Sequence, residues 1–212
     1  MLDVHAPAGK MESVKDFLLH VLTMTVGLFI ALLLEGCVER HHKAEVRREA
    51  EANLWQEVVD NQRRLTEAQP VMKAEEKTLK IVLDFLSAKE AGKQSQLPAI
   101  DLGFSIRSLR DASWRTASVT GALALMDYQE VQSFAGMYQV QEQLMQLQNE
   151  TLNDFLQMQA YTVYGFDVNK VTPSYAAAAE VDVRRALSHL EAMEQIAAGM
   201  STIYDKALAE RK

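Results

Sequence analysis

An unbroken apolar run extends from Phe17 to Leu34 and holds no residue that is permanently charged at neutral pH. Its polar members are His20, Thr23 and Thr25. At a rise of about 1.5 Å per residue, a helix of this length covers roughly the thickness of a bilayer's hydrocarbon core. The run therefore divides the chain into three predicted parts: a short N-terminal tail over 1–16, a transmembrane helix over 17–38, and a soluble helical domain over 39–212.

Two other kinds of N-terminal segment share this apolar character. A cleaved secretory signal has a shorter apolar region and an A-x-A-like cleavage site, and neither is found here. A lipoprotein signal ends in a box of small residues before a cysteine. The stretch Leu34 to Cys37 has the leucine and the glycine, but Glu35 interrupts it, and the sequence from Val38 onward is helical in pattern. We prefer a retained transmembrane helix and keep the lipoprotein as the alternative.

Positive charge around the apolar run bears on its orientation. Lys10 and Lys15 precede the run, and a larger group of basic residues follows it: Arg40, Lys43, Arg47 and Arg48. Because cytoplasmic flanks carry the excess of lysine and arginine, this count favours a cytoplasmic C-terminal domain. Short N-terminal tails end on either side of a membrane, so both orientations stay open.

Small residues recur every four positions in the apolar run, at Thr23, Gly27 and Ala31. They form a stripe that lets a second helix approach closely, as in pairs of membrane helices. We therefore expect a homo-oligomer or a partner membrane protein in addition to the lipid bilayer. His20 and Glu35 lie near the ends of the run, where their side chains reach the interface.

The composition of the chain favours long helices. Hydrophobic residues make up 48% but aromatic residues only 7%, and the 212 residues include four prolines and nine glycines. Low proline and glycine with abundant Ala, Leu, Met, Glu and Gln is typical of helical proteins. The net charge of −7 argues against a nucleic-acid binder, which needs a basic face. The single cysteine, Cys37, excludes an internal disulfide.

The apolar periodicity predicts an all-α fold, in which an N-terminal transmembrane helix continues into an up-and-down bundle of about five helices. We expect the first helix to run from about Glu12 to Gln69, with Pro70 ending or kinking it. The predicted remainder is a second helix over 72–86, a loop over 92–103, a third helix over 106–125, a fourth from Asp127, and a fifth that begins with Thr172 as cap and Pro173 in its first turn. Gly165 and the turn at 171–174 separate the last two.

Two details of the expected bundle are specific enough to test. The fourth helix carries a heptad-like seam of Val131, Phe134, Tyr138, Gln141, Met145, Gln148, Leu152 and Phe155. Gly121 lies in the third helix among the small residues Ala117, Thr120 and Ala124. Glycine is unfavourable inside a helix, so we interpret it as a point where a neighbouring helix lies backbone-close.

Motifs that carry chemistry are not evident. The sequence has no glycine-rich phosphate loop, no H-E-x-x-H and no nucleophile elbow, and we predict no catalytic residue, no metal and no cofactor. His41 and His42 are adjacent, so their rings point about 100° apart on a helix and do not clamp one metal ion. An alternative is a weak metal or pH-sensing face of Glu35, Glu39, His42 and Glu45. His189 is expected at the surface or in a satisfied core position.

Two stretches carry a resemblance to known sequences. The first is Lys15-Asp16-Phe17, Thr25-Val26-Gly27-Leu28, Ala31-Leu32, Leu34-Glu35 and Val38-Glu39 leading into His41-His42. The second is Trp114, Ala117, Thr120-Gly121-Ala122-Leu123, Met126-Asp127-Tyr128, Glu130-Val131 and Tyr138. Together they resemble uncharacterised bacterial single-pass membrane proteins of the domain-of-unknown-function type. The resemblance implies residence in the bacterial inner membrane and a helical domain, and it carries no known activity.

These observations lead to two hypotheses for the function. The first is a non-enzymatic, membrane-anchored interaction module that serves as a scaffold or accessory subunit. The second is a ligand- or pH-sensing helical bundle that signals through a separate partner protein. Its ligand or partner face would include Trp114, Arg115, Tyr128 and Tyr138.

Overall fold

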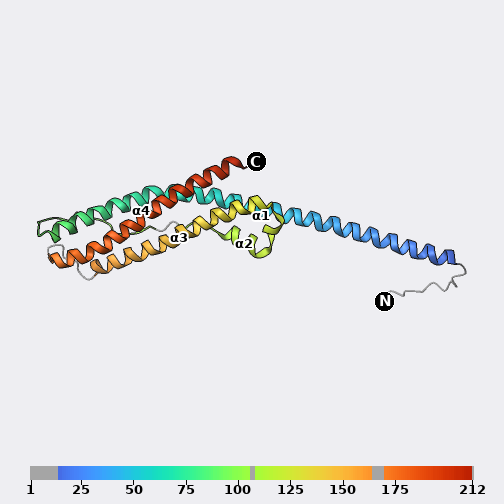
Figure 1. Ribbon diagram of the computed structural model, residues 1–212, viewed down its shortest axis with the longest axis horizontal. Helices are drawn as coiled ribbons and strands as arrows, with labels where there is room; N and C mark the ends of the chain where they lie inside the picture. The colour runs from blue at the N-terminus through green and yellow to red at the C-terminus, as the bar shows by residue number, and fades with distance from the viewer. Residues whose placement is uncertain (1–13, 106–107, 164–169, 212) are drawn as a thin grey trace. The chain divides into compact units, whose positions relative to one another are not determined.

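The computed structural model describes residues 14–105, 108–163 and 170–211, and every regular element in these ranges is a helix. This confirms the predicted all-α class. The chain divides into two compact units, Met1–Arg48 and Glu49–Lys212, which we call unit 1 and unit 2. The elements, labelled in Figure 1, are α1 (Val14–Glu90), α2 (Ala112–Thr120), the 3₁₀ helix η1 (Ala122–Leu125), α3 (Tyr128–Val163) and α4 (Pro173–Glu210). The predicted start near Glu12 and the predicted separator Gly165 fall outside the described residues. In place of the predicted third helix over 106–125, the described chain has the short helix α2 and then η1, with Gly121 between them.

The described ranges hold four α-helices and not the predicted five, because α1 does not end at Pro70. A proline inside a helix removes one backbone hydrogen bond and weakens the helix by about 3 kcal/mol. Here the pyrrolidine ring is exposed, while Leu65, Ala68 and Met72 on either side of it are buried in the core. Burial of these side chains on both sides of Pro70 offsets the loss, so the predicted first and second helices are one.

Unit 1 contains the first part of α1. Its apolar side chains from Phe17 to Leu34 are all exposed. Among the described helices, α1, which contains this segment, is the one that is long and apolar enough to cross a membrane. The hydroxyls of Thr23 and Thr25 donate to the carbonyls one turn earlier, Leu19 at 2.9 Å and Val21 at 2.8 Å. Both threonines therefore have their hydrogen bonds satisfied without water.

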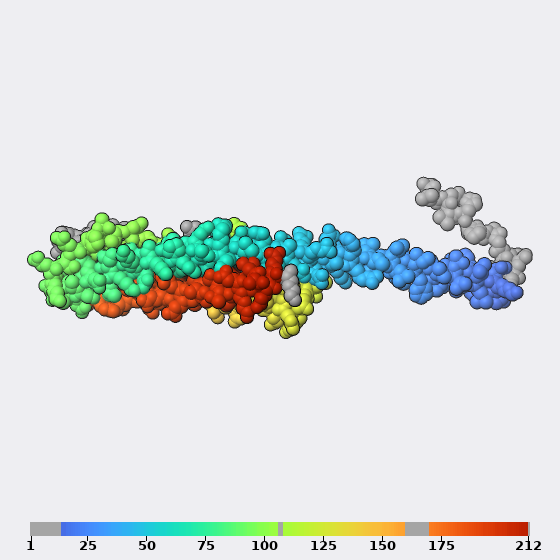
Figure 2. Space-filling model, turned by 90° about the horizontal axis from the view of Figure 1, so that it is seen from above, coloured from blue at the N-terminus to red at the C-terminus, as the bar shows by residue number. Residues whose placement is uncertain are grey.

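Unit 2 is built on the second part of α1 together with α3 and α4. The second part of α1 and α4 lie side by side in both views (Figures 1 and 2), and side chains link them at Gln62 with Asp205 (2.6 Å) and at Ser87 with Glu180 (3.0 Å). Residues from all three helices form the core, with Leu54, Leu79, Phe134, Leu190, Met200 and Tyr204 almost fully buried. The predicted start of α4 is confirmed, because the Thr172 hydroxyl accepts the Tyr175 N–H and Pro173 begins the helix.

The prediction for Gly121 is wrong. The residue is not inside a packed helix but terminates α2, with φ +76° and ψ 9° in the left-handed region. A Cβ built on it meets no atom within 4 Å, so no neighbouring backbone lies close. Glycine is favoured here because an L-residue is strained at this φ. Ala117 and Ala122 are buried at the α2–η1 corner, whereas Thr120 and Ala124 are exposed.

A connecting segment, residues 93–105 and 108–111, joins α1 to α2 without regular secondary structure. It packs on the helices through Leu109, which is buried, and through Phe104, whose ring stacks on that of Phe155 at 4.9 Å. Buried side chains of α1 hold its backbone. Among them, a Glu75 carboxylate oxygen accepts the Ser105 N–H at 2.7 Å.

Candidate functional site: a hollow beside Trp114 and Tyr138

The site starts from two polar residues on the apolar face of α1. Glu57 and Asn61 are one turn apart, so their side chains share a face, and their exposed fractions are 6% and 0%. The Asn61 amide donates to the Arg110 carbonyl and accepts from the Arg110 N–H, both at 2.7 Å. Gln141 of α3 donates to the same carbonyl at 2.8 Å. The end of the connecting segment is therefore fixed between α1 and α3.

Glu57 fixes the beginning of α2 in the same way. One of its carboxylate oxygens accepts the Ser113 N–H at 2.9 Å, and the other accepts the Tyr138 hydroxyl at 2.6 Å. Among the described residues no lysine, arginine or histidine forms an ion pair with this buried carboxylate. Burial and the neighbouring Glu57 carboxylate raise the pKa of Tyr138 well above its usual value of 10, so its hydroxyl keeps its proton.

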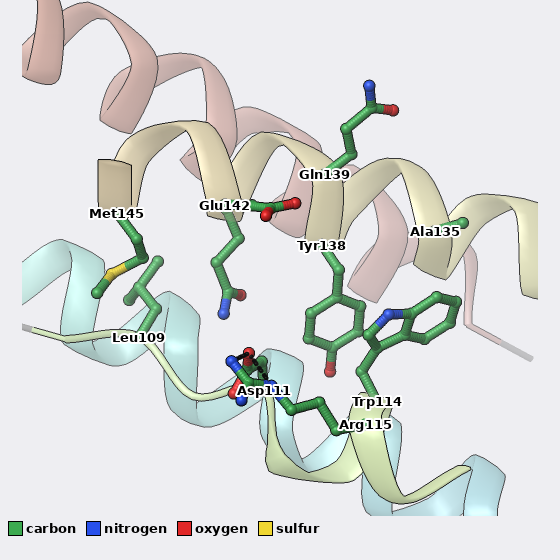
Figure 3. A pocket seen from close by; sticks show the side chains of 10 residues that line it. Leu109, Asp111, Trp114, Arg115, Ala135, Tyr138, Gln139, Glu142 and Met145 are labelled. Atoms are coloured by element: carbon green, nitrogen blue, oxygen red, sulfur yellow. Dashed lines mark hydrogen bonds and ion pairs between the residues drawn. The ribbon is translucent and has the colours of Figure 1, made fainter. Parts of the chain in front are cut away.

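An aromatic pair lies next to the hydrogen-bonded Glu57. The rings of Trp114 from α2 and Tyr138 from α3 stack with centroids 5.1 Å apart and planes 17° apart. Figure 3 shows the two rings side by side where α2 meets α3. Because Ser113 and Tyr138 are both held by Glu57, the pair is positioned by the polar core beneath it and not only by ring contact.

A hollow of about 500 Å³ opens beside this pair. It is lined by Trp114 and Tyr138, by the apolar side chains of Leu109 and Met145, and by charged groups from α2 and α3. Arg115 donates to Asp111 at 2.6 Å, drawn as a dashed line in Figure 3, so these two charges neutralise each other. Glu142 adds a further carboxylate. Gln139 and Gln141 add neutral polar groups, so the hollow offers a small molecule apolar surface and hydrogen-bonding groups together.

The structure brings together three of the four residues predicted for a ligand or partner face. Trp114, Arg115 and Tyr138 all line the hollow. Tyr128 does not, and it is 75% exposed at the beginning of α3. Most of the predicted α3 seam is buried, namely Phe134, Tyr138, Gln141, Gln148 and Phe155, while Val131, Met145 and Leu152 are half-buried.

The predicted membrane stripe is open in the structure. Thr23, Gly27 and Ala31 are exposed, and a Cβ built on Gly27 meets nothing within 4 Å. The described residues contain no cluster of His, Cys, Asp and Glu able to hold a metal ion, so the alternative face of Glu35, Glu39, His42 and Glu45 does not form one. Glu39 instead pairs with Lys43 at 3.0 Å.

Sequence reasoning missed the two residues beneath the hollow, although a signal for them exists. Glu57 and Asn61 fall on the same helical stripe as Leu54, Val58 and Leu65, all of which are buried. A polar residue on an apolar stripe is expected to meet a hydrogen-bond partner in the core. The partners themselves could not be predicted, because they are backbone groups 49 and 56 residues away.

A second polar cluster joins α3 to α4 and involves His189. The buried Asp154 carboxylate accepts from Arg185 at 2.8 Å and contacts the His189 ring nitrogen at 2.7 Å. His189 is thus half-buried with a hydrogen-bond partner, between the two predicted alternatives of the surface and a satisfied core position. The interaction with Asp154 raises the pKa of Arg185, which remains charged. We interpret this cluster as a link between the helices.

Comparisons with protein-family models, with curated proteins and with solved structures found no match for this chain. The resemblance to bacterial single-pass membrane proteins therefore stays a prediction.

Proposed function

We propose that the protein is a non-enzymatic, membrane-anchored helical interaction module, a scaffold or accessory subunit of the bacterial inner membrane. The observation that carries the proposal is the apolar segment Phe17 to Leu34, which is exposed throughout and continues within α1 into unit 2. Apolar side chains in such number are stable when lipid or another apolar helix covers them. In this proposal the second part of α1, α3 and α4 form an up-and-down bundle on the cytoplasmic side.

Self-association through Thr23, Gly27 and Ala31 is part of the proposal. The stripe has open space at Gly27. A leucine there should hold a second helix away, because close packing of membrane helices depends on small residues. The full chain in mild detergent, studied by crosslinking and blue-native electrophoresis, is expected to be an oligomer that Gly27→Leu dissociates. A monomer with no co-purifying partner would refute the proposal.

Thr23 and Thr25 provide a matched pair for this experiment. Both hydroxyls donate to the carbonyl one turn earlier, and two positions on a helix are about 200° apart. Thr23→Leu on the stripe is expected to weaken crosslinking, whereas Thr25→Leu on the opposite face should leave it unchanged. Equal effects of the two substitutions would show that the stripe is not the contact.

The side of the membrane is tested separately. Ala209 is exposed near the end of α4, so a cysteine placed there in a Cys37→Ser background is accessible to a maleimide. In intact bacterial cells, a cytoplasmic unit 2 is expected to be labelled only by a membrane-permeant maleimide. Labelling by an impermeant maleimide would place unit 2 outside the cytoplasm.

The hollow supports a second candidate function, in which unit 2 senses a small ligand and passes the signal to a separate protein. Its walls come from α2, α3 and the connecting segment, so a ligand there contacts three separate elements. Hydrogen exchange of the full chain with and without ligand tests this function. Sensing requires altered exchange in α1 or α4, and changes confined to the lining of the hollow would refute it.

A further inference from the structure

The hollow beside Trp114 and Tyr138 carries an unbalanced negative charge. The Asp111 and Arg115 side chains neutralise each other at 2.6 Å. Glu142 lines the hollow and forms no ion pair with any described residue. Arg115 is already bound to Asp111, so it offers little attraction to an anion. The charge that a ligand meets at the wall is therefore that of Glu142.

A second carboxylate lies beneath the aromatic pair. Glu57 is 6% exposed and receives hydrogen bonds only from neutral donors, the Ser113 N–H and the Tyr138 hydroxyl. A buried carboxylate without a positive partner keeps a strong field, because the interior screens it less than water does. The Tyr138 ring lies between this charge and the hollow, since its hydroxyl contacts Glu57 while its ring lines the cavity. A positive charge in the hollow is thus attracted from below as well as from the wall.

The aromatic rings also favour a positively charged ligand in the hollow. Tryptophan and tyrosine rings carry negative charge on their faces and attract cations within about 6 Å of the ring centre. Leu109, Ala135 and Met145 add apolar surface to the lining, and Gln139 and Gln141 add neutral polar groups. A hydrated metal ion gains little from such walls, whereas the carbon atoms of an organic cation contact them. The volume of about 500 Å³ is within the range of sites for small organic ligands.

We propose that this hollow binds a small organic cation, an alkylated ammonium group whose charge faces Glu142 and whose carbon atoms contact Trp114, Tyr138 and Met145. The proposal rests on the ligand-sensing function and names the chemical class of its ligand. A carboxylate at one side and an aromatic surface at the other are the two features that recognise such a group.

Choline and its neutral analogue 3,3-dimethyl-1-butanol test the proposal directly, because they have nearly the same shape and differ in charge. The chain has two tryptophans, so in a Trp55→Phe background the emission of the full chain in detergent reports Trp114 alone. Choline is expected to change this emission saturably at constant ionic strength, and the alcohol should not. Calorimetry of the unsubstituted chain measures the same binding without relying on a variant.

Glu142→Gln is the decisive substitution, because the side chain is exposed and its loss leaves the core intact. We expect it to weaken choline binding about threefold to tenfold, as removal of one partly solvated charge should. Glu150→Gln, also exposed on α3 but outside the hollow, is the matched control and should leave binding unchanged.

The outcomes separate this proposal from the function on which it rests. Equal binding of choline and the alcohol would overturn the cation class while leaving a ligand site in place. Absence of binding by either probe would overturn the ligand class, and the sensing function would then depend on another ligand changing exchange in α1 or α4. Choline binding that Glu142→Gln weakens supports the proposal even if exchange in α1 and α4 does not respond, and that lack of response would refute sensing alone.

Discussion

Substitution of Gly121 distinguishes conformational strain from crowding at the α2–η1 corner. The residue has φ +76°, and the position of a Cβ there is open to solvent. Any L-residue is therefore strained by the backbone but meets no neighbour. If Gly121 were packed against another helix, larger side chains would be increasingly unfavourable. If φ alone decides, alanine and leucine should behave alike.

The expected change in the free energy of unfolding on substitution of Gly121 is the sum of two opposing contributions. The left-handed conformation is unfavourable for an L-residue by roughly 1–2 kcal/mol. Replacing glycine also restricts the unfolded chain, which stabilises the folded state by about 0.4–1 kcal/mol. We expect both Gly121→Ala and Gly121→Leu to lower the free energy of unfolding by about 1 kcal/mol. Gly121→Asn should lose less, because asparagine tolerates this region better.

Urea unfolding of the full chain in mild detergent, followed by tryptophan emission, measures these differences. Trp55 and Trp114 both belong to unit 2, so the signal reports the unit that contains Gly121. Gly136 is the matched control, since it lies inside α3, has no positive φ, and has open space at its Cβ. Gly136→Ala should therefore stabilise the chain by about 0.4–1 kcal/mol.

Two results would refute this reasoning. A Gly121→Ala variant as stable as the unsubstituted chain would mean that φ is not left-handed in solution. A Gly121→Leu variant that loses several times more than Gly121→Ala would mean that another part of the protein covers the site.

Three further substitutions and one control test the polar core and the long helix, all measured by denaturant titration of the full chain. Asp154→Asn should lower the free energy of unfolding by about 1–3 kcal/mol, because it leaves the half-exposed Arg185 without its buried partner, while Glu67→Gln in an exposed ion pair should change it by less than about 1 kcal/mol. Burial raises the pKa of Glu75 above 4.5, so the folded chain binds this proton more tightly than the unfolded chain does. The free energy of unfolding therefore falls as the pH rises from 4.5 through the higher pKa of the folded chain. Glu75→Gln should then be more stable than the unsubstituted chain at neutral pH, with the advantage disappearing below pH 4.5. Pro70→Ala should raise the free energy of unfolding by about 1–3 kcal/mol, because it restores a backbone hydrogen bond at an exposed position, and no gain would show that the helix is interrupted there.

Features that depend on local periodicity could be predicted from the sequence. The apolar segment is a continuous run of neighbouring residues. The all-α class and the seam through Phe134, Tyr138 and Gln141 follow from apolar residues that repeat at helical spacing. The cap of α4 is also local, since Thr172 and the following proline satisfy the first turn by themselves. Trp114 and Tyr138 share one predicted face and both line the hollow, although only the structure shows that their rings stack.

Features that depend on tertiary contacts could not be predicted in this way. Pro70 reads as a helix end because its local effect is unfavourable, and the buried residues that override it become apparent only in the folded chain. A glycine among small residues, such as Gly121, is compatible with close helix packing and with a positive φ, and the sequence does not distinguish these two roles. The position of the Glu57 carboxylate beneath the hollow depends on its hydrogen bond from the Ser113 N–H, and no helical period relates these two residues.

The attachments of the connecting segment to α1 also set an order in which loops close during folding. Glu75 reaches Ser105 across 30 residues, Asn61 reaches Arg110 across 49, and Glu57 reaches Ser113 across 56, so each loop encloses the one before it. Closing the innermost loop first leaves only short additional lengths of chain to order for the next two. This nesting favours growth of the structure from the turn at Gly92, just after α1, toward Glu57. The negatively charged base of the hollow would then be assembled last, after the chain on both sides of it is in place.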